Sequence, residues 1–428
     1  MKLLIDNIKR FARHDFIKDV LKLTTGTVLA RVITLGAMPI VTRLYSPEDF
    51  ALLAVYMAML SMISIVACLR LDIAIPLAED DRDAANLLAL SLLALLLVVS
   101  ITSFVVLFAP GSVSKLLGSS EIMPYIWLAI LGFAMAGTYS AMQHWFTRMR
   151  RFGAIAFTRI AQAMTGVVTM LAFGWVGIAP LGLLLGNALN IGSGGIGLGY
   201  RALQADGIIL RGISIDNMVA TFRKYIRYPL FSTPEALANT AGIQVPILLI
   251  AAQGGSEAGF LFLAKLIIAV PLALLGRSIA QVYMSRASEE FRNGNLAKFT
   301  SSIMRQLALV GAVPLILIGI ISPMAFPFLF GEEWVRAGEI VSWLVPWMVL
   351  QFIASPVSMV MFVVGRQRAM LALQIFGAII RIGFVAYAIN IGVSSVMVFA
   401  VSSAVFYSLC CVVFLIASRD TNYERGLA

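Results

Sequence analysis

Long apolar stretches constrain this chain more than any other feature of its sequence. Twelve of them lie near 21–43, 50–76, 86–109, 124–144, 153–174, 179–201, 228–252, 257–284, 303–327, 338–363, 369–390 and 393–417. A helix of about 20 apolar residues is long enough to cross a bilayer. Because the stretches are continuous rather than alternating, they favour helices over a closed barrel. The sequence predicts an all-α polytopic membrane protein with twelve transmembrane helices.

The composition agrees with a membrane protein and argues against several other classes. Hydrophobic residues make up 60% of the chain and charged residues 13%, whereas a soluble domain has about 25% charged residues. The net charge of +10 does not indicate nucleic-acid binding, because the basic residues are dispersed among short loops. Cys68, Cys410 and Cys411 fall in apolar stretches, and His14 and His144 are isolated. We therefore expect no metal centre, disulfide framework or cofactor.

The distribution of Lys and Arg predicts how the chain is oriented. With the first span entering from the cytoplasm, most of the 32 Lys and Arg residues fall in loops on the side of the N-terminus. The positive-inside rule therefore places both termini in the cytoplasm. The leader "MKLLIDNIKRFARHDFIKDV" has apolar residues at helical spacing among its charges. It predicts a basic helix lying in the membrane interface, with an ordinary solvated leader as the alternative.

The chain is expected to consist of two similar halves. The segment "FRKYIRYPLFSTPEALANTAGIQVP" repeats the layout of "FIKDVLKLTTGTVLARVITLGAMP": a basic lead, a polar stripe with Thr, and a proline. The longest central loop separates six spans from six. We expect an N-terminal six-helix bundle at 1–201, a cytoplasmic linker with an amphipathic segment at 202–227, and a C-terminal six-helix bundle at 228–428.

Five cationic side chains fall inside the spans, namely Arg31, Arg70, Arg159, Lys265 and Arg381. A charge at such depth costs about 2.5–3.5 kcal/mol on insertion scales. Arg31, Lys265 and Arg381 are too deep to reach the interface easily, which favours an interior filled by water or ligand. The alternative is a structural ion pair, for example with Glu235. Arg70 and Arg159 lie near the cytoplasmic ends and could extend to the interface instead.

Uncharged polar residues lie at helical spacing from the charges in the spans. They are predicted to line the same interior. The alternative for the threonines is a hydrogen bond to a carbonyl one turn earlier. The predicted lining residues are Thr24, Thr27, Thr34, Gln162, Asn239 and Gln374.

The signs of the charges indicate what the interior binds. Against the five cations stand Glu235 and, near a cytoplasmic end, Asp72. A low-dielectric cavity with surplus positive charge attracts anions, and Arg binds phosphate in a bidentate manner. We therefore predict an anionic, phosphorylated substrate. Glu235 is the candidate for ion coupling or gating, with Na⁺ or H⁺ as the coupling ion.

Several segments resemble one family of membrane proteins. The segment 39–93, with the runs "RLYSPEDF" and "LRLDIAIPL", resembles the N-terminal signature of polysaccharide and O-antigen flippases. In the second half, "AGFLFLAKLIIAVPLALLGRSIAQVYMSRASE" and "LFGEEWVRAGEIVSWLVPWMVLQFIASPVSMVMFVVGRQ" resemble the same family. One departure is Ala51, where the family usually has Gly after S-P-E-D-F.

This resemblance implies a fold and a function. The family belongs to the multidrug/oligosaccharidyl-lipid/polysaccharide (MOP) exporter superfamily, whose fold is two pseudo-symmetric six-helix bundles around a central cavity. The implied activity is a flippase of the bacterial inner membrane. It would move undecaprenyl-pyrophosphate-linked O-antigen, lipopolysaccharide or exopolysaccharide repeat units to the periplasmic leaflet by alternating access. Membrane lipids, a polysaccharide polymerase and a chain-length regulator are the implied partners. By helix position, Arg31, Arg70 and Lys265 match the cations around the pyrophosphate in a lipid II flippase of the superfamily.

Two rival functions remain at this stage. A multidrug or cation antiporter of the same fold would need carboxylates in its cavity, and they are scarce here. A membrane polysaccharide polymerase or ligase would display a large outer loop, whereas the longest outer loops, near 110–123 and 328–337, are short. We therefore expect a transporter rather than an enzyme.

Overall fold

The computed structural model describes residues 24–419, apart from the side chains at 116, 270–282, 284, 285 and 288. The described residues are helical almost throughout and include no strand. Ten of their helices are long and apolar enough to cross a membrane. The chain is therefore a multi-pass membrane protein. The predicted interfacial leader lies outside the described residues.

The long helices follow the predicted spans closely. In the first half they are Thr24–Leu44, α2 (Pro47–Ala67), α4 (Asp81–Phe108), α6 (Ile126–Arg148), α7 (Phe152–Val176), α8 (Leu181–Gly192) and α9 (Gly194–Leu210). In the second half they are α11 (Thr233–Ala251), α12 (Glu257–Arg292), α13 (Leu296–Phe330), α14 (Val335–Val357), α16 (Gln367–Asn390) and α17 (Ser395–Ser418). The ten helices that are long and apolar enough to cross a membrane do not include α11 and α12, which lie at the predicted spans 228–252 and 257–284.

Shorter helices connect these spans. They are α3 (Leu71–Ala74), α5 (Pro110–Leu117), α10 (Ile215–Tyr225) and α15 (Val360–Val363). The chain divides into two compact units, which are described separately. Unit 1 comprises Met1–Tyr45, Met59–Leu116 and Ser120–Leu237, and unit 2 comprises Ser46–Ala58, Leu117–Ser119 and Ala238–Ala428. The predicted linker at 202–227 contains the end of α9 and all of α10. The domain boundaries drawn from the sequence stay a prediction.

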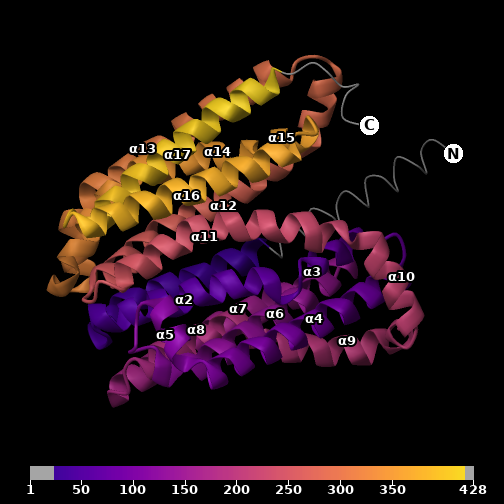
Figure 1. Cartoon of the computed structure of the whole chain (residues 1–428), viewed down its shortest axis with the longest axis horizontal. Helices are drawn as coiled ribbons and strands as arrows, with labels where there is room; N and C mark the ends of the chain where they lie inside the picture. Colours follow the sequence, from indigo (N-terminus) through magenta and orange to yellow (C-terminus); the bar gives the residue numbers. More distant parts are fainter. Residues whose placement is uncertain (1–23, 420–428) are drawn as a thin grey trace. The chain divides into compact units, whose positions relative to one another are not determined.

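In unit 1, α6 packs against α4, α8 and α9, and α7 packs against α8 (Figure 1). The close approach of α7 to α8 depends on small residues. A Cβ atom on Gly166 would lie only 2.6 Å from the carbonyl oxygen of Gly186. Small residues let backbones approach closely in membranes, where apolar side chains gain little by leaving lipid.

In unit 2, α14 packs against α12, α13 and α17, while α16 packs against α17 (Figure 1). A Cβ atom on Gly338 would lie 2.6 Å from the carbonyl oxygen of Ser322, so α13 and α14 also approach closely. The helix α13 continues through Pro314, Pro323 and Pro327. These prolines therefore do not end the helix, although each one removes a backbone hydrogen bond.

The second span differs from the prediction. The apolar run 50–76 predicts one helix, but α2 ends at Ala67 and α3 begins at Leu71. Between them, Leu69 and Arg70 have φ angles of 50° and 61°. This left-handed conformation is rare for residues that carry a Cβ atom. A continuous apolar pattern gives no sign of such a break, because hydropathy does not report backbone angles.

Candidate functional site

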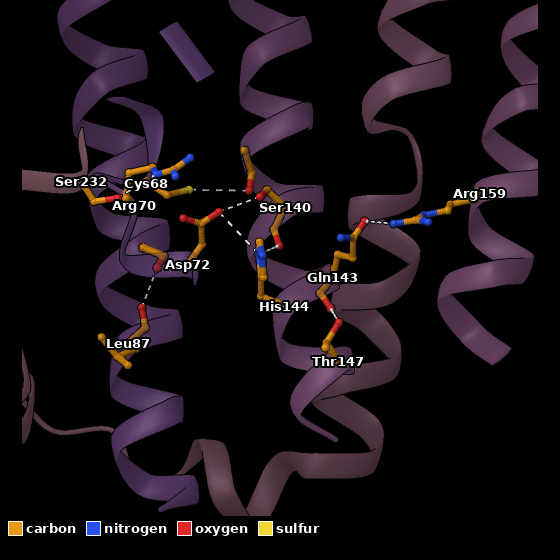
Figure 2. Close-up of polar contacts among 12 residues, drawn as sticks. Cys68, Arg70, Asp72, Leu87, Ser140, Gln143, His144, Thr147, Arg159 and Ser232 are labelled. Atoms are coloured by element: carbon orange, nitrogen blue, oxygen red, sulfur yellow. Dashed lines mark hydrogen bonds and ion pairs between the residues drawn. The ribbon is translucent and has the colours of Figure 1, made fainter. Parts of the chain in front are cut away.

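The break in the second span brings polar side chains of unit 1 together (Figure 2). Nε of Arg70 donates to Oγ of Ser232 over 3.4 Å. Ser232 is the last residue of a π-helical segment, Tyr228–Ser232, that leads into α11. Glu235, in the first turn of α11, lies close enough to be attracted to the charge of Arg70, although no ion pair within 4 Å joins these two described residues. Two residues predicted separately from the sequence, Arg70 and Glu235, thus lie in one cluster.

Asp72 in α3 lies in the same region and faces α6 (Figure 2). It is only 7% exposed. Its Oδ2 accepts a hydrogen bond from Oγ of Ser140 at 2.6 Å and lies 3.6 Å from Nδ1 of His144. The sequence interpretation of His144 as an isolated residue is therefore wrong: the structure places it beside a buried carboxylate.

Arg159 in α7 is held by neutral side chains. Its Nη1 donates to Oγ1 of Thr27. Its Nη2 donates to Oε1 of Gln143 over 3.1 Å (Figure 2). The guanidinium thus joins α7 to the first helix and to α6. Because both acceptors are uncharged, they do not balance its positive charge.

The first helix carries its predicted polar residues in different surroundings. Arg31 and Thr24 are exposed. Oγ1 of Thr34 donates to the carbonyl of Ala30 at 3.0 Å and accepts from Nδ2 of Asn190 at 3.2 Å. The bond to Ala30 is the back-bonding that the sequence left open as the alternative for threonines.

The remaining predicted lining residues are amides. Nε2 of Gln162 donates to the carbonyl of Ile191 at 3.2 Å, which ties α7 to α8. Asn239 is half-buried in α11. Gln374 is buried in α16, where its Nε2 lies 4.0 Å from Sδ of Met370.

Unit 2 holds the other two predicted cations, Lys265 in α12 and Arg381 in α16. Nζ of Lys265 lies 5.5 Å from the ring centroid of Trp347 and 5.9 Å from that of Phe399. Cζ of Arg381 lies 4.5 Å from the ring centroid of Phe406. The two cations are close enough to repel each other. Their aromatic neighbours attract a cation by about 0.5–2 kcal/mol.

Arg381 is fully buried, with 0% of its surface exposed. Its Nε donates to the carbonyl of Gly377 at 2.9 Å. Among the described residues, neither Nη1 nor Nη2 has a hydrogen-bond partner, although the Tyr407 hydroxyl lies nearby. Nε1 of Trp347 and Oγ of Ser403 are also buried without a partner. Buried donors without acceptors are costly, so these groups are available to an anionic ligand.

Three carboxylates of unit 2 have partners other than Lys265 and Arg381. Arg336 binds Glu257 at 3.0 Å and Glu339 at 2.8 Å. Glu48 accepts a hydrogen bond from Ser256. Within the part of the chain that the structure describes, no carboxylate forms an ion pair with Lys265 or Arg381. Among the described residues of unit 2, the charges of Lys265 and Arg381 are therefore not balanced by an adjacent carboxylate.

Unit 1 contains an ion pair with a buried acid that was not predicted from the sequence. Asp206 is 4% exposed and accepts from Nη1 and Nη2 of Arg151 at 2.9 and 2.6 Å. It also accepts from Nε1 of Trp145 at 2.9 Å. The signal that could have found it is a lone acid near the end of an apolar helix, because such a charge needs a partner.

The acidic run 79–83 is also neutralised within unit 1. Asp81 pairs with Arg148 at 3.0 Å. Nζ of Lys224 on α10 lies 2.7 Å from Asp83 and 2.8 Å from Glu79. The hydrogen bonds from Asp83 and then Glu79 raise the pKa of Lys224 above its usual range. These contacts fix the amphipathic helix α10 against the start of α4.

The sequence of this chain matches the model of one protein family. A family model described as polysaccharide biosynthesis protein matches residues 40–339. No curated protein sequence matches the chain.

Solved structures are similar over nearly the whole chain. An outward-facing multidrug resistance MATE family transporter of the MOP superfamily has 15% identity and a TM-score of 0.64, with 94% of this chain and 95% of that chain covered. Lipid II flippase MurJ, in an inward closed conformation, has 12% identity and a TM-score of 0.71, with 93% and 87% covered. A MOP superfamily transporter from Pyrococcus furiosus has 14% identity and a TM-score of 0.62, with 94% and 95% covered. These similarities confirm the predicted all-α, twelve-helix MOP fold.

Proposed function

Because the chain belongs to the polysaccharide biosynthesis protein family, we propose that it is a flippase for a lipid-linked oligosaccharide. The substrate is an undecaprenyl-pyrophosphate-linked repeat unit of O-antigen or exopolysaccharide. It moves from the cytoplasmic to the periplasmic leaflet of a bacterial inner membrane by alternating access. The family description supports a saccharide substrate, and the similarity to a lipid II flippase supports a lipid-linked one.

The pair Lys265 and Arg381 carries this proposal. Two cations that repel each other lie in the interior of unit 2 without a carboxylate partner among the described residues. A buried, uncompensated cation is expensive, whereas a diphosphate offers several acceptor oxygens and two negative charges. Lys265 is partly exposed and Arg381 is not. Lys265 therefore makes the first contact, and Arg381 binds once the helices around it move apart.

The cations of unit 1 have a second role in this proposal. Arg31 is exposed, and Arg70 and Arg159 are half-buried, so they attract the head group electrostatically. Arg70 interacts with Glu235 in the absence of substrate. A diphosphate that binds Arg70 would weaken the attraction between Arg70 and Glu235, which makes Glu235 the candidate for gating or ion coupling.

The driving force needs no covalent chemistry. Moving one charge through 100 mV contributes about 2.3 kcal/mol. The interior of a cell is negative, so the potential alone favours outward movement of an anionic diphosphate. Sodium or proton coupling would add to this. The same proposal places both termini in the cytoplasm and gives the protein membrane lipids, a polysaccharide polymerase and a chain-length regulator as partners.

A multidrug exporter is the rival function within this fold, since MATE transporters have similar structures. The unpaired cations of unit 2 disfavour it, because they would repel a cationic drug. A polymerase or ligase is the rival among enzymes. Both rivals predict normal movement of the lipid-linked repeat unit when the protein is absent.

The test is an analysis of lipid-linked glycans in a strain that lacks the gene. We expect an undecaprenyl-linked repeat unit to accumulate on the cytoplasmic side, and its structure to identify the substrate. Accumulation of repeat units on the periplasmic side would instead indicate a polymerase or ligase. Normal glycan export together with increased drug sensitivity would indicate a drug exporter.

A further inference from the structure

Asp72 and His144 form a contact that diphosphate binding does not explain (Figure 2). Asp72 is a buried acid in a chain whose proposed substrate is itself an anion. Its Oδ2 is held by the Ser140 hydroxyl at 2.6 Å and faces Nδ1 of His144 at 3.6 Å. Within the described residues, no Lys or Arg side chain forms an ion pair with it. The charge of Asp72 is therefore balanced at short range only when His144 is protonated.

The geometry of His144 identifies where a proton would bind. Nδ1 lies 2.8 Å from the carbonyl oxygen of Ser140, and a carbonyl oxygen can only accept. The neutral ring therefore carries its hydrogen on Nδ1, which leaves Nε2 to take a further proton. The His144 side chain is 25% exposed, so the ring is not enclosed on all sides by protein. His144 also lies near the C-terminus of α6, where the helix dipole favours a cation.

We propose that Asp72 and His144 together bind one proton and form the proton-coupling site of this transporter. The coupling part rests on the proposed transport function, whereas proton binding itself does not. Among side chains, imidazole is the one used most often to exchange protons near neutral pH, which makes an imidazole beside a buried carboxylate suited to holding a transferable proton. The proton is shared by two interacting groups, and its binding is a property of the pair.

Other titratable or charged groups near the pair are already engaged. In the break, Arg70 interacts with Glu235. The Cys68 thiol lies near Asp72 and donates to the carbonyl of Gly137 over 3.7 Å. On α4, which packs against α3, the acids that pair with basic residues are Asp81, with Arg148, and Asp83, with Lys224. Asp72 and His144 thus face each other as an acid and a base that can share a proton.

The site lies next to the strained part of unit 1. Leu69 and Arg70, with positive φ angles, directly precede α3. When His144 is protonated, it neutralises Asp72, and Arg70 interacts chiefly with Glu235. When the proton leaves, the charge of Asp72, in the helix that directly follows the break, is no longer balanced by His144. Strained segments persist only where surrounding contacts hold them, so a change of charge here can shift the break between two arrangements.

Proton binding can be tested on the whole chain because it contains only two histidines. In a His14→Gln variant, labelled with ¹³C-histidine and reconstituted in nanodiscs, one imidazole signal remains and reports the titration of His144. We expect Asp72→Asn to lower the pH of half-protonation by about one pH unit, since an opposite charge has been removed at close range. Glu79→Gln, a control that removes an exposed acid paired with Lys224, should leave this pH unchanged.

The proposal would be overturned if the pH of half-protonation of His144 were the same in the Asp72→Asn variant and its parent. It would also be overturned if Glu79→Gln shifted this pH as much as Asp72→Asn does. Should Asp72→Asn fail to fold, a second measurement decides. The melting temperature of the parent should exceed that of His144→Gln by more at pH 5.5 than at pH 8, because the ion pair exists only when His144 is protonated. A difference independent of pH would contradict the proposal.

Coupling is tested in proteoliposomes that contain the lipid-linked oligosaccharide and an imposed pH gradient. We expect the gradient to accelerate transport by the parent and by Glu79→Gln, but not by His144→Gln. Equal acceleration in His144→Gln would refute coupling at this site. If the parent transports no lipid-linked oligosaccharide at all, the proposed function fails, and the titration still decides whether the pair binds a proton.

Discussion

Gly242 leaves the space that the guanidinium of Arg381 occupies. A Cβ atom on Gly242 would clash with Nη2 of Arg381 and would lie 2.9 Å from Cα of Ala378. The helix α11 therefore passes α16 at this point only because residue 242 is a glycine. A fully buried cation is thus positioned by the fit of its neighbours rather than by a carboxylate, and this fit can be tested directly.

We predict that Gly242→Ala lowers the free energy of unfolding by about 1–3 kcal/mol, the usual cost of overpacking. Transport should fall as well, because Arg381 must move. Gly383→Ala on α16 is the matched control, since a Cβ atom there meets nothing within 4 Å. Chemical unfolding in detergent compares the two variants. A Gly242→Ala protein as stable as Gly383→Ala would show that the contact is looser than described.

Lys265→Ala should weaken binding of an undecaprenyl diphosphate lipid by roughly 10- to 100-fold, the effect of losing a charge-assisted hydrogen bond. Lys265→Arg keeps the charge and should retain most of the affinity. Lys115→Ala removes an exposed cation and serves as the control. Microscale binding measurements with the purified protein give the three affinities. If Lys115→Ala loses as much affinity as Lys265→Ala, the loss reflects the net charge of the protein and not a binding site at Lys265.

Asp206→Asn should destabilise unit 1 by about 1–3 kcal/mol, because it removes a charge-assisted hydrogen bond to Arg151, whose guanidinium is itself partly exposed. Asp81→Asn removes an exposed partner of Arg148 and should cost about 0–1 kcal/mol. Thermal unfolding in the same detergent separates the two variants. Similar melting temperatures would mean that water reaches and solvates Arg151 when Asp206 is lost.

Arg150, in the turn between α6 and α7, has a φ angle of 54° and is exposed. We predict that Arg150→Gly stabilises the protein by about 1 kcal/mol, because glycine adopts this conformation without a steric penalty. Arg150→Val should be destabilising, since a β-branched residue is strained there. Melting temperatures in the opposite order would contradict the assigned backbone conformation.

Hydropathy was enough to predict the helices of this chain but not their breaks. The predicted span 369–390 agrees with α16 to within two residues at its start. The span 50–76 does not, because the positive φ angles of Leu69 and Arg70 leave no mark in a run of apolar residues. Side-chain composition determines whether a segment can lie in lipid, whereas backbone angles depend on tertiary contacts.

The sequence also identified the deep cations but not their neighbours. Arg381 stood out because a charge in an apolar helix is costly. Its contact with Gly242 joins residues far apart in the chain, and the sequence pattern around either residue does not indicate it. The same is true of His144 and Asp72, which seemed unrelated until folding brought α3 against α6. The functional roles of the predicted site residues stay predictions that transport measurements must decide.

Transport of an undecaprenyl-pyrophosphate-linked oligosaccharide in proteoliposomes tests the central claim most directly. The fraction of glycan accessible on the far side is followed over time for the parent and for Lys265→Ala and Arg381→Ala. Transport by the parent that exceeds protein-free vesicles, with at least a roughly tenfold loss in each correctly folded variant, is the result we predict. Transport by both variants at the rate of the parent would contradict a role for these cations in binding the diphosphate.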